Sequence, residues 1–374
     1  MDARRVFCLI CRQLYGPAST LLFRFVWLHK RGQARRLAQA LQGLPQLGSL
    51  IRRLDVDTSS NPAAILVSAL DVRDILLHTT GLITFIDNCS TYTNVGQHDA
   101  QYSAMMPGLS SRCRDTLRHV HVSSYPERKP WTALVEPFTL CPFLHTLEID
   151  LSTNGAAVQS AAIAGLPLHF LELRLLEITL ISTHDDAMNQ VLSAVAGWSL
   201  PRLETMRLLG TIPSGPGILQ IVAAHGARLL HLELGTLVSA RDVVATNAPN
   251  LRKLTITVPK HADLTRAIPS SHLSLEEIDI HDTGATAASV YSTEMVHLIR
   301  HLNQTSFPRL RSIRVVLESS RLTQASTETH TLSLPLATAP SASWGEVPRH
   351  VNSSTKIHTL FDLPPPCVQQ NWRN

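Results

Sequence analysis

One short pattern of aliphatic residues recurs along the middle of the chain and constrains the fold more than any other feature. Each copy has the form Leu-x-x-Leu-x-Leu, with Ile, Val or Met in place of Leu at some positions. The clear copies begin at Leu117, Leu144, Leu173, Leu203, Leu229, Leu251, Leu275 and Leu310. Successive copies start roughly 22 to 35 residues apart, which is the length of one strand plus one helix or loop. The recurrence predicts a chain of stacked repeats.

Two weaker copies precede the clear ones, at Leu54–Val56 and Leu82–Phe85. In every copy the last two aliphatic residues are two positions apart, so they share one face of a strand. Ordering one repeat of about 25 residues costs roughly 25–50 kcal/mol of backbone entropy. Burial of its three aliphatic side chains returns only about 5–9 kcal/mol. A single copy therefore does not fold, and neighbouring copies must bury one another's aliphatic rows.

The repeated pattern resembles the leucine-rich-repeat family over roughly residues 50–318. The resemblance implies an α/β solenoid, in which strands alternate with helices. Regular members of that family place Asn or Cys three residues after the last strand aliphatic. The corresponding positions of this chain hold Ser152, Thr211, Leu237, Pro259, Thr283 and Glu318. We therefore expect an irregular solenoid arc, with an ordinary doubly wound α/β domain as the alternative.

The N-terminal segment carries a second pattern. Apolar residues recur at helical spacing over 4–14, Gly16 and Pro17 interrupt them, and a short helix over 18–23 leads into a strand over 23–28. The segment resembles the C-terminal half of an F-box in Ile10-Cys11-Arg12, Pro17, Leu21-Leu22-Phe23-Arg24 and Phe25-Val26-Trp27. This resemblance implies docking on the Skp-type adaptor of cullin-RING, SCF-type ubiquitin ligases. The residues implied to face the adaptor are Ile10, Arg12, Leu14, Pro17 and Leu22.

The first half of the F-box pattern, with its Leu-Pro start and first amphipathic helix, has no counterpart after Met1. In the F-box family this part supplies much of the surface that contacts the adaptor. Two alternatives stay open. Either the coding sequence begins upstream of Met1, or the protein no longer docks on the adaptor.

These patterns divide the chain into three parts. We expect partial F-box-like helices over 1–30, the solenoid over 31–318, and a Pro-, Ser- and Thr-rich tail over 319–374. The tail is predicted to be disordered, with a short strand or helix that caps the last repeat as the alternative. Helices are predicted over 32–44, 63–79, 185–196, 217–225, 241–247 and 285–302, and residues 88–112 are predicted to form an inserted loop.

Bulk composition excludes several classes of partner. The 374 residues carry a net charge of only +4, so general polyanion binding is not implied. Basic residues near the N-terminus lack an aromatic platform, so we expect a solvated face and no nucleic-acid partner. No apolar run reaches the ~18 residues of a membrane span, and no membrane partner is expected. The cysteines are few and irregularly spaced, which indicates a reducing compartment, cytoplasmic or nuclear.

The sequence offers no constellation for catalysis. Cys8-x-x-Cys11 is a lone pair in a helical setting, which favours packing over zinc binding or redox work. The glycine-rich stretch 210–217 contains no Lys and has prolines that remove amide donors, so it does not predict a phosphate loop. His184-Asp185-Asp186 is explained by an acidic first turn of a helix. We therefore expect no enzyme activity, no cofactor and no metal site.

With no site for catalysis, the remaining interpretation is that the protein binds a partner on one of its surfaces. In each predicted strand the residues that alternate with the buried aliphatics face the other way and line the concave face. These predicted partner-binding residues are His119, His121, Glu148, Asp150, Glu177, Arg207, Glu233, Lys253, Thr255, Asp279, His281 and Arg314. Their mixed charge suits a protein or peptide partner, although a merely solubilising surface explains any single one equally well.

Three hypotheses of function follow. The first is a non-catalytic substrate receptor of an SCF-type ubiquitin ligase. The second is a repeat scaffold that binds a protein partner with no ligase link, and the third and weakest is an enzyme. The predicted strand facing also gives a contrast, in which Leu254→Asp unfolds the chain whereas Lys253→Glu affects only partner binding.

Overall fold

The fold is described from a computed structural model of residues 1–374. The structure describes residues 20–58, 67–88, 105–124, 132–153, 167–182, 185–210, 215–235, 241–258, 268–282, 302, 305–317 and 328–332. By its internal contacts the chain divides into two units, Met1–Leu334 and Pro335–Asn374. All the described residues lie in the first unit.

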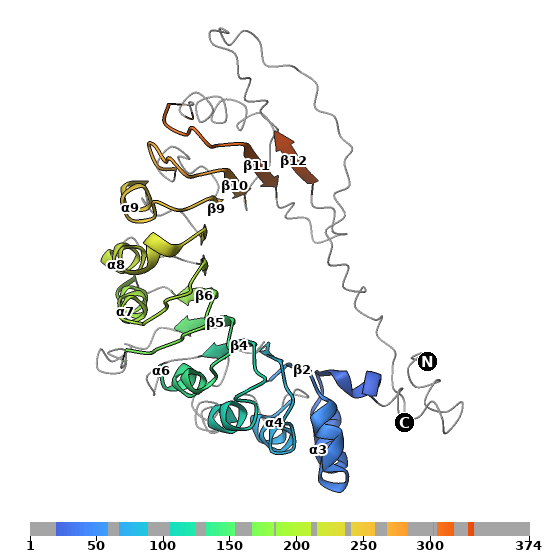
Figure 1. Ribbon diagram of the computed structural model, residues 1–374. Helices are drawn as coiled ribbons and strands as arrows, with labels where there is room; N and C mark the ends of the chain where they lie inside the picture. The colour runs from blue at the N-terminus through green and yellow to red at the C-terminus, as the bar shows by residue number, and fades with distance from the viewer. Residues whose placement is uncertain are drawn as a thin grey trace. The chain divides into compact units, whose positions relative to one another are not determined.

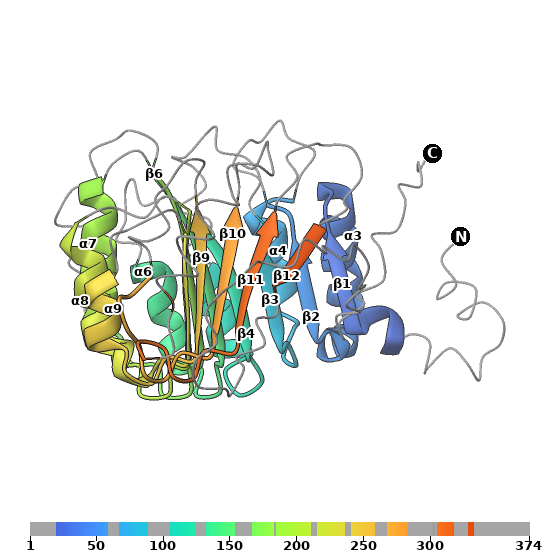
Figure 2. The same cartoon turned by 90° about the horizontal axis from the view of Figure 1, so that it is seen from above.

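The first unit is built on one 12-stranded sheet in which the strands follow their order in the sequence. Figure 2 shows the strands side by side. Strands β1 to β11 pair in parallel, and β12 pairs with β11 in the antiparallel sense. The strands are β1 (Phe25–Leu28), β2 (Arg53–Val56), β3 (Thr84–Asp87), β4 (His119–Ser124), β5 (Thr146–Thr153), β6 (Leu175–Ser182), β7 (Thr205–Gly210), β8 (His231–Leu234), β9 (Lys253–Val258), β10 (Glu277–Asp282), β11 (Ser312–Leu317) and β12 (Glu328–Leu332).

The helices lie on one side of this sheet, on its convex side, and leave the opposite face without a helix over the described residues (Figure 1). The α-helices are α3 (Arg31–Gly43), α4 (Ala69–Leu76), α6 (Thr132–Val135), α7 (Asp185–Ala196), α8 (Pro216–His225) and α9 (Arg241–Asn247). Short 3₁₀ helices are η1 (Pro45–Leu50), η2 (Glu136–Leu140) and η4 (Gly226–Arg228). This alternation of strand and helix agrees with the predicted solenoid-like arc.

Two rows of aliphatic side chains form the core between the sheet and the helices. The first row runs through Val120, Leu147, Leu176, Met206, Leu232 and Leu254, which are register partners on successive strands. All six are 0% exposed. The second row, two residues further along each strand, includes Val122, Ile149, Ile178 and Leu208, and these are also fully buried. The period-two assignment of buried positions is therefore confirmed.

Polar links between successive repeats supplement the strand ladder on the helix side. The Cys113 thiol donates to the Thr79 carbonyl at 3.3 Å. Nε2 of His225 lies 3.1 Å from the carbonyl oxygen of Val195. In the same way, Nε2 of His272 lies 2.9 Å from the carbonyl oxygen of Ala248. Each link gives a buried polar side chain a partner among the main-chain carbonyls at the end of the preceding repeat's helical segment.

Gly210 and Gly217, in the glycine-rich stretch 210–217, are explained by backbone conformation and close packing. Gly210 ends β7 with a φ of 79°, where a Cβ would lie 2.1 Å from the Leu180 carbonyl oxygen. Gly217 lies in the first turn of α8, directly after Pro216, and its amide donates to the Asn189 side chain at 3.0 Å. That amide already has a partner, and a Cβ there would meet the α7 backbone. The close approach of α7 and α8 accounts for this glycine.

Several sequence predictions need correction or fall outside the described residues. Residues 105–112, predicted as part of a loop, are helical, because Met105, Met106 and Leu109 pack into the core. Phe25–Leu28, grouped above with the F-box-like segment, is the first strand of the sheet. Within the tail predicted to be disordered, Glu328–Leu332 forms β12 and pairs with β11, which agrees with the alternative of a short strand that caps the last repeat. The helix predicted over 63–79 is seen as Ala69–Leu76, and the one over 285–302 lies outside the described residues apart from its last residue.

Candidate functional site: the inner face of the sheet

The face of the sheet opposite the helices, here called the inner face, collects the predicted partner-binding residues. Their central row runs through His121, Glu148, Glu177, Arg207, Glu233, Thr255, Asp279 and Arg314, which are register partners on β4 to β11. His119 and Lys253 lie in the row on one side, two residues earlier in their strands, and Asp150 and His281 lie in the row on the other side. Most of these side chains are half-buried, whereas Thr255 and Asp279 are buried.

At the N-terminal end of this face, aromatic and charged side chains lie together. Phe25 and Trp27 on β1 are 41% and 48% exposed, and their register partners are Arg53 and Asp55. The Arg53 guanidinium lies 5.1 Å from the centre of the Phe25 ring and donates two hydrogen bonds of 2.9 Å to Asp55. The sequence analysis did not assign these aromatics to the inner face. Residues 25–28 are apolar throughout, so no alternation of polar and apolar residues indicated which of them face the inner side.

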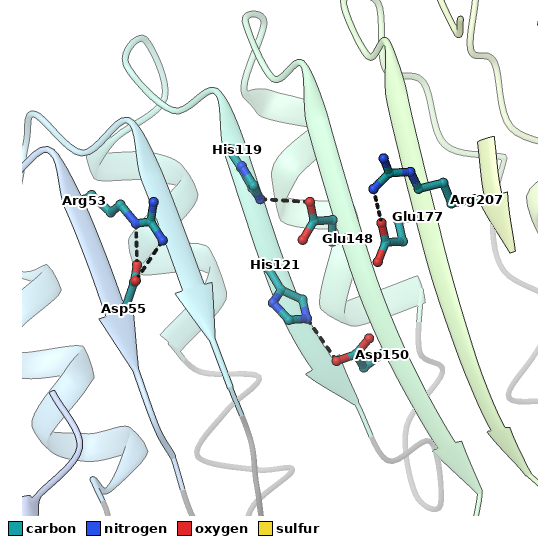
Figure 3. Close-up of polar contacts among 8 residues, drawn as sticks. All are labelled: Arg53, Asp55, His119, His121, Glu148, Asp150, Glu177 and Arg207. Atoms are coloured by element: carbon teal, nitrogen blue, oxygen red, sulfur yellow. Dashed lines mark hydrogen bonds and ion pairs between the residues drawn. The ribbon is translucent and has the colours of Figure 1, made fainter. Parts of the chain in front are cut away.

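Two histidines on β4 pair with carboxylates on β5 (Figure 3). Nε2 of His119 lies 3.2 Å from Oε1 of Glu148, and Nε2 of His121 lies 2.9 Å from Oδ2 of Asp150. Burial by itself lowers the pKa of His121, but the bond to Asp150 and the neighbouring carboxylates outweigh it, so this pKa is raised. Burial acts to raise the pKa values of Glu148 and Asp150, yet the histidines outweigh it and both pKa values are lowered.

Arg207 lies between two carboxylates in the central row. Its Nη1 is 3.1 Å from Glu177, and its Nε is 3.2 Å from Glu233. On its other side Glu177 is the register partner of Glu148, so two carboxylates are direct lateral neighbours. Burial, together with the charges of Glu148 and Glu233, raises the pKa of Glu177 in spite of Arg207. The charge of Glu177 is therefore disfavoured in the folded chain.

We expect Glu177→Gln to preserve or raise the melting temperature. Glutamine keeps an acceptor for Arg207, while the like-charge contact with Glu148 is relieved, a contribution of about 0.2–1 kcal/mol for a cross-strand pair. The matched control is Glu233→Gln, which makes the same change at the other carboxylate partner of Arg207 but leaves the lateral contact between Glu148 and Glu177 in place. Thermal unfolding followed by circular dichroism compares the two, and an equal loss in both variants would contradict the assigned repulsion.

At the C-terminal end of the face, charges pair around the buried Asp279. Lys253 Nζ lies 2.9 Å from Asp279, and Arg314 donates to both of its oxygens at 2.8 and 3.0 Å. Burial opposes the charge of Asp279, but these two cations outweigh it and lower its pKa. His231 sits nearby, 3.1 Å from Thr255 Oγ1, and burial together with Lys253 and Arg207 lowers its pKa to about 4. These charges compensate one another within the molecule.

This pairing corrects the expectation that Lys253→Glu leaves stability unchanged. A glutamate there would replace a cation of buried Asp279 by a second carboxylate. The predicted facing of Lys253 holds, but its side chain also stabilises the sheet.

The residues implied to face an adaptor are mostly outside the described part of the chain. Leu22 lies in the helical residues 20–24 and is half-buried. Ile10, Arg12, Leu14 and Pro17 are not among the described residues, so the structure does not place them.

The described residues were also searched for metal ligands, reactive thiols and membrane-spanning helices. Among them no group of His, Cys, Asp or Glu is placed to hold a metal ion. Burial raises the pKa of Cys113 to about 11 and that of Cys141 to about 12, so both are protonated thiols and poor nucleophiles at neutral pH. Over the same residues no helix has the length and apolar character of a membrane span.

Comparisons with known proteins add little. No family model matches the chain, and no curated protein matches it. Among solved structures the matches include a chain of the yeast Rad7 and Elc1 complex, with 13% identity and a TM-score of 0.31. That match covers 81% of this chain and 88% of the other. A likeness at this identity and score supports no inference about function.

Proposed function

We propose that this protein is a non-catalytic interaction module whose inner face binds a protein partner. The observation that carries the proposal is the row of polar, mostly half-buried side chains from β4 to β11 on a face that no described helix covers. Such a surface offers hydrogen-bonding and charged groups on a frame that is held rigid by the aliphatic rows beneath it. A partner that matches these charges gains specificity more than raw affinity.

Carboxylates outnumber cations on the inner face. The acidic residues are Asp55, Glu148, Asp150, Glu177, Glu233, Glu277 and Asp279, and the basic residues are Arg53, Arg207, Lys253 and Arg314. Electrostatic steering therefore favours a partner surface of positive charge. The exposed Phe25 and Trp27 at one end supply aromatic contact area of the kind that dominates binding energy at protein interfaces.

The finer proposal is a substrate receptor of an SCF-type ubiquitin ligase. Its support is the resemblance of residues 10–27 to the second half of an F-box, directly ahead of the repeats. In this arrangement the repeats hold the target while the N-terminal segment meets a Skp-type adaptor. The alternative is a scaffold with the same inner face and no ligase link.

Site-specific photo-cross-linking tests the inner face. A photoreactive phenylalanine analogue replaces Thr205, which is half-buried on the inner face, and in a control replaces Gln220, which is exposed on α8. We expect a cross-linked protein from cell extract with the first probe and not with the second. Cross-linking of the same protein from both positions, or from α8 alone, would argue against the inner face.

Co-purification tests the ligase link separately. The full chain is expressed with a Skp-type adaptor and cullin, alone and with any coding sequence upstream of Met1. Stable association supports the receptor, whereas its absence in both forms leaves the scaffold, because inner-face cross-linking does not depend on the adaptor.

A further inference from the structure

A second surface, distinct from the inner face, is formed where the chain enters the strands. Because β1 to β11 run parallel, all of their first residues lie along one edge of the sheet, and Figure 2 shows the preceding turns along that edge. We call the turn residues immediately ahead of each strand the strand-start rim. Main-chain hydrogen bonds fix its register, since Arg118 N donates to the Ile83 carbonyl and Arg174 N to the His145 carbonyl, at 2.8 and 2.9 Å.

Ahead of β5 to β11 one equivalent position in each turn of the rim is apolar, and these positions form an apolar line; ahead of β3 and β4 the equivalents are Thr80 and Asp115. At the equivalent place in successive turns stand Pro142, Leu171, Pro201, Ala227, Pro249, Leu273 and Pro308. All of them except Pro142 are exposed. Leu273 is 73% exposed and Leu171 is 64% exposed, the highest values among the exposed large hydrophobic residues. Single exposed apolar residues need no explanation, but an aligned series along one edge does.

Arginines flank this apolar line. Those in the position directly before a strand are Arg24, Arg52, Arg118, Arg174, Arg252 and Arg311, and those inside the turns are Arg202, Arg228 and Arg309. Carboxylates on the rim are fewer, and two of them are compensated, Glu172 by Arg202 and Glu276 by Arg311. The rim is therefore cationic, whereas the inner face has an excess of carboxylates.

The rim combines three properties in one place. It is a single edge along which strands about 4.8 Å apart start in register. It carries exposed aliphatic side chains at its tips and positive charge beside them. Phosphate contacts to a nucleic acid would use the arginines but leave Leu171 and Leu273 without a role. An anionic lipid surface uses both, because arginines meet the headgroups while apolar tips enter the boundary with the acyl chains.

We propose that the strand-start rim binds peripherally to an anionic membrane surface. The sequence contains no apolar run long enough to span a membrane, which argues against integral insertion. Binding to the surface of a membrane does not require such a run. In this arrangement Leu171 and Leu273 enter the interface, and Arg174 and Arg252 contact lipid phosphates. The inner face does not take part, so the inference stands independently of the proposed function.

Vesicle sedimentation tests the proposal. The full chain is mixed with phosphatidylcholine vesicles, and with vesicles in which roughly a third of the lipid is phosphatidylserine. We expect binding to the anionic vesicles only, weakened at about 0.5 M salt, where the Debye length shrinks to a few Å. Leu171→Ser with Leu273→Ser, and separately Arg174→Gln with Arg252→Gln, should each lower the partition coefficient about tenfold.

Matched controls keep the test specific. Leu219→Ser and Arg35→Gln remove the same kinds of side chain from exposed positions on α8 and α3, and both should bind like the unmodified chain. All the substituted residues are exposed, so melting temperatures should stay within a few degrees of one another. Failure to bind anionic vesicles, or equal binding by the rim variants, would overturn the proposal. So would binding to duplex DNA that needs the arginines but not the leucines, in the absence of vesicle binding.

Discussion

Leu254→Asp is expected to unfold the sheet. Leu254 is 0% exposed, and its register partners Leu232 and Ile278 are buried on the strands at either side. Loss of the leucine side chain and burial of an unpaired carboxylate together cost about 5 kcal/mol or more. This is a large part of the stability of an ordinary domain. Because each rung is stabilised by its neighbours, the loss should spread beyond β9.

The matched control is Thr257→Asp on the same strand. Thr257 is half-buried on the inner face, three residues further on, so the introduced carboxylate reaches solvent. We expect a loss of no more than about 1 kcal/mol there, the scale of strand propensity. Circular dichroism and limited proteolysis of the two purified chains provide the comparison. Comparable unfolding in both variants would contradict the assigned facing of β9.

The positions and facing of most strands could be predicted from the sequence, because the aliphatic pattern that marks them is strong and repeated. Aligning the copies on their aliphatic positions places Glu177, Arg207 and Glu233 side by side, and the register shows the same neighbours. The diagonal contacts could not be read in this way. The pairing of His121 with Asp150 joins different rows, and such contacts depend on side-chain rotamers that a repeat pattern does not specify.

Other features were missed for identifiable physical reasons. β1 lacks the leading leucine of the repeat and has no alternation of polar and apolar residues, so its aromatic and β-branched residues indicated a strand but not its place in this sheet. The helical residues 105–112 were hidden by polar neighbours, although Met105, Met106 and Leu109 have helical spacing. The strand-start rim becomes visible only when the turns of all repeats are compared at once, because the few apolar and basic residues of a single turn are unremarkable by themselves.

Acidification is expected to destabilise the protein through buried histidines that link repeats. His225 and His272 are 3% and 4% exposed, and each has Nε2 at a main-chain carbonyl of the preceding repeat. The Nδ1 atom of His272 also accepts from the Ser274 amide at 3.3 Å, which fixes the neutral tautomer. Burial lowers the pKa of both imidazoles and outweighs the carbonyl bonds, which favour the charged form.

The sign of the effect follows from where the proton binds first. A histidine in the unfolded chain has a pKa of about 6.5, so below that pH the unfolded chain takes up protons that the folded chain refuses. Stability from these residues is therefore complete above about pH 6.5 and is lost as the pH falls toward the lowered folded values. His121 and Glu177, whose pKa values are raised, act in the opposite direction.

Comparison with His225→Gln and His272→Gln in one chain isolates the contribution of the two imidazoles. Glutamine donates to a carbonyl at every pH but fits the imidazole site less well, so this variant should melt several degrees lower at about pH 7.5. Between about pH 7.5 and pH 5 its melting temperature should fall less than that of the unmodified chain, because it has lost two groups that resist protonation. The opposing groups are common to both chains and cancel in the difference. If the melting temperatures of the two chains fell by the same amount across this pH range, these histidines would not be what makes the fold acid-sensitive.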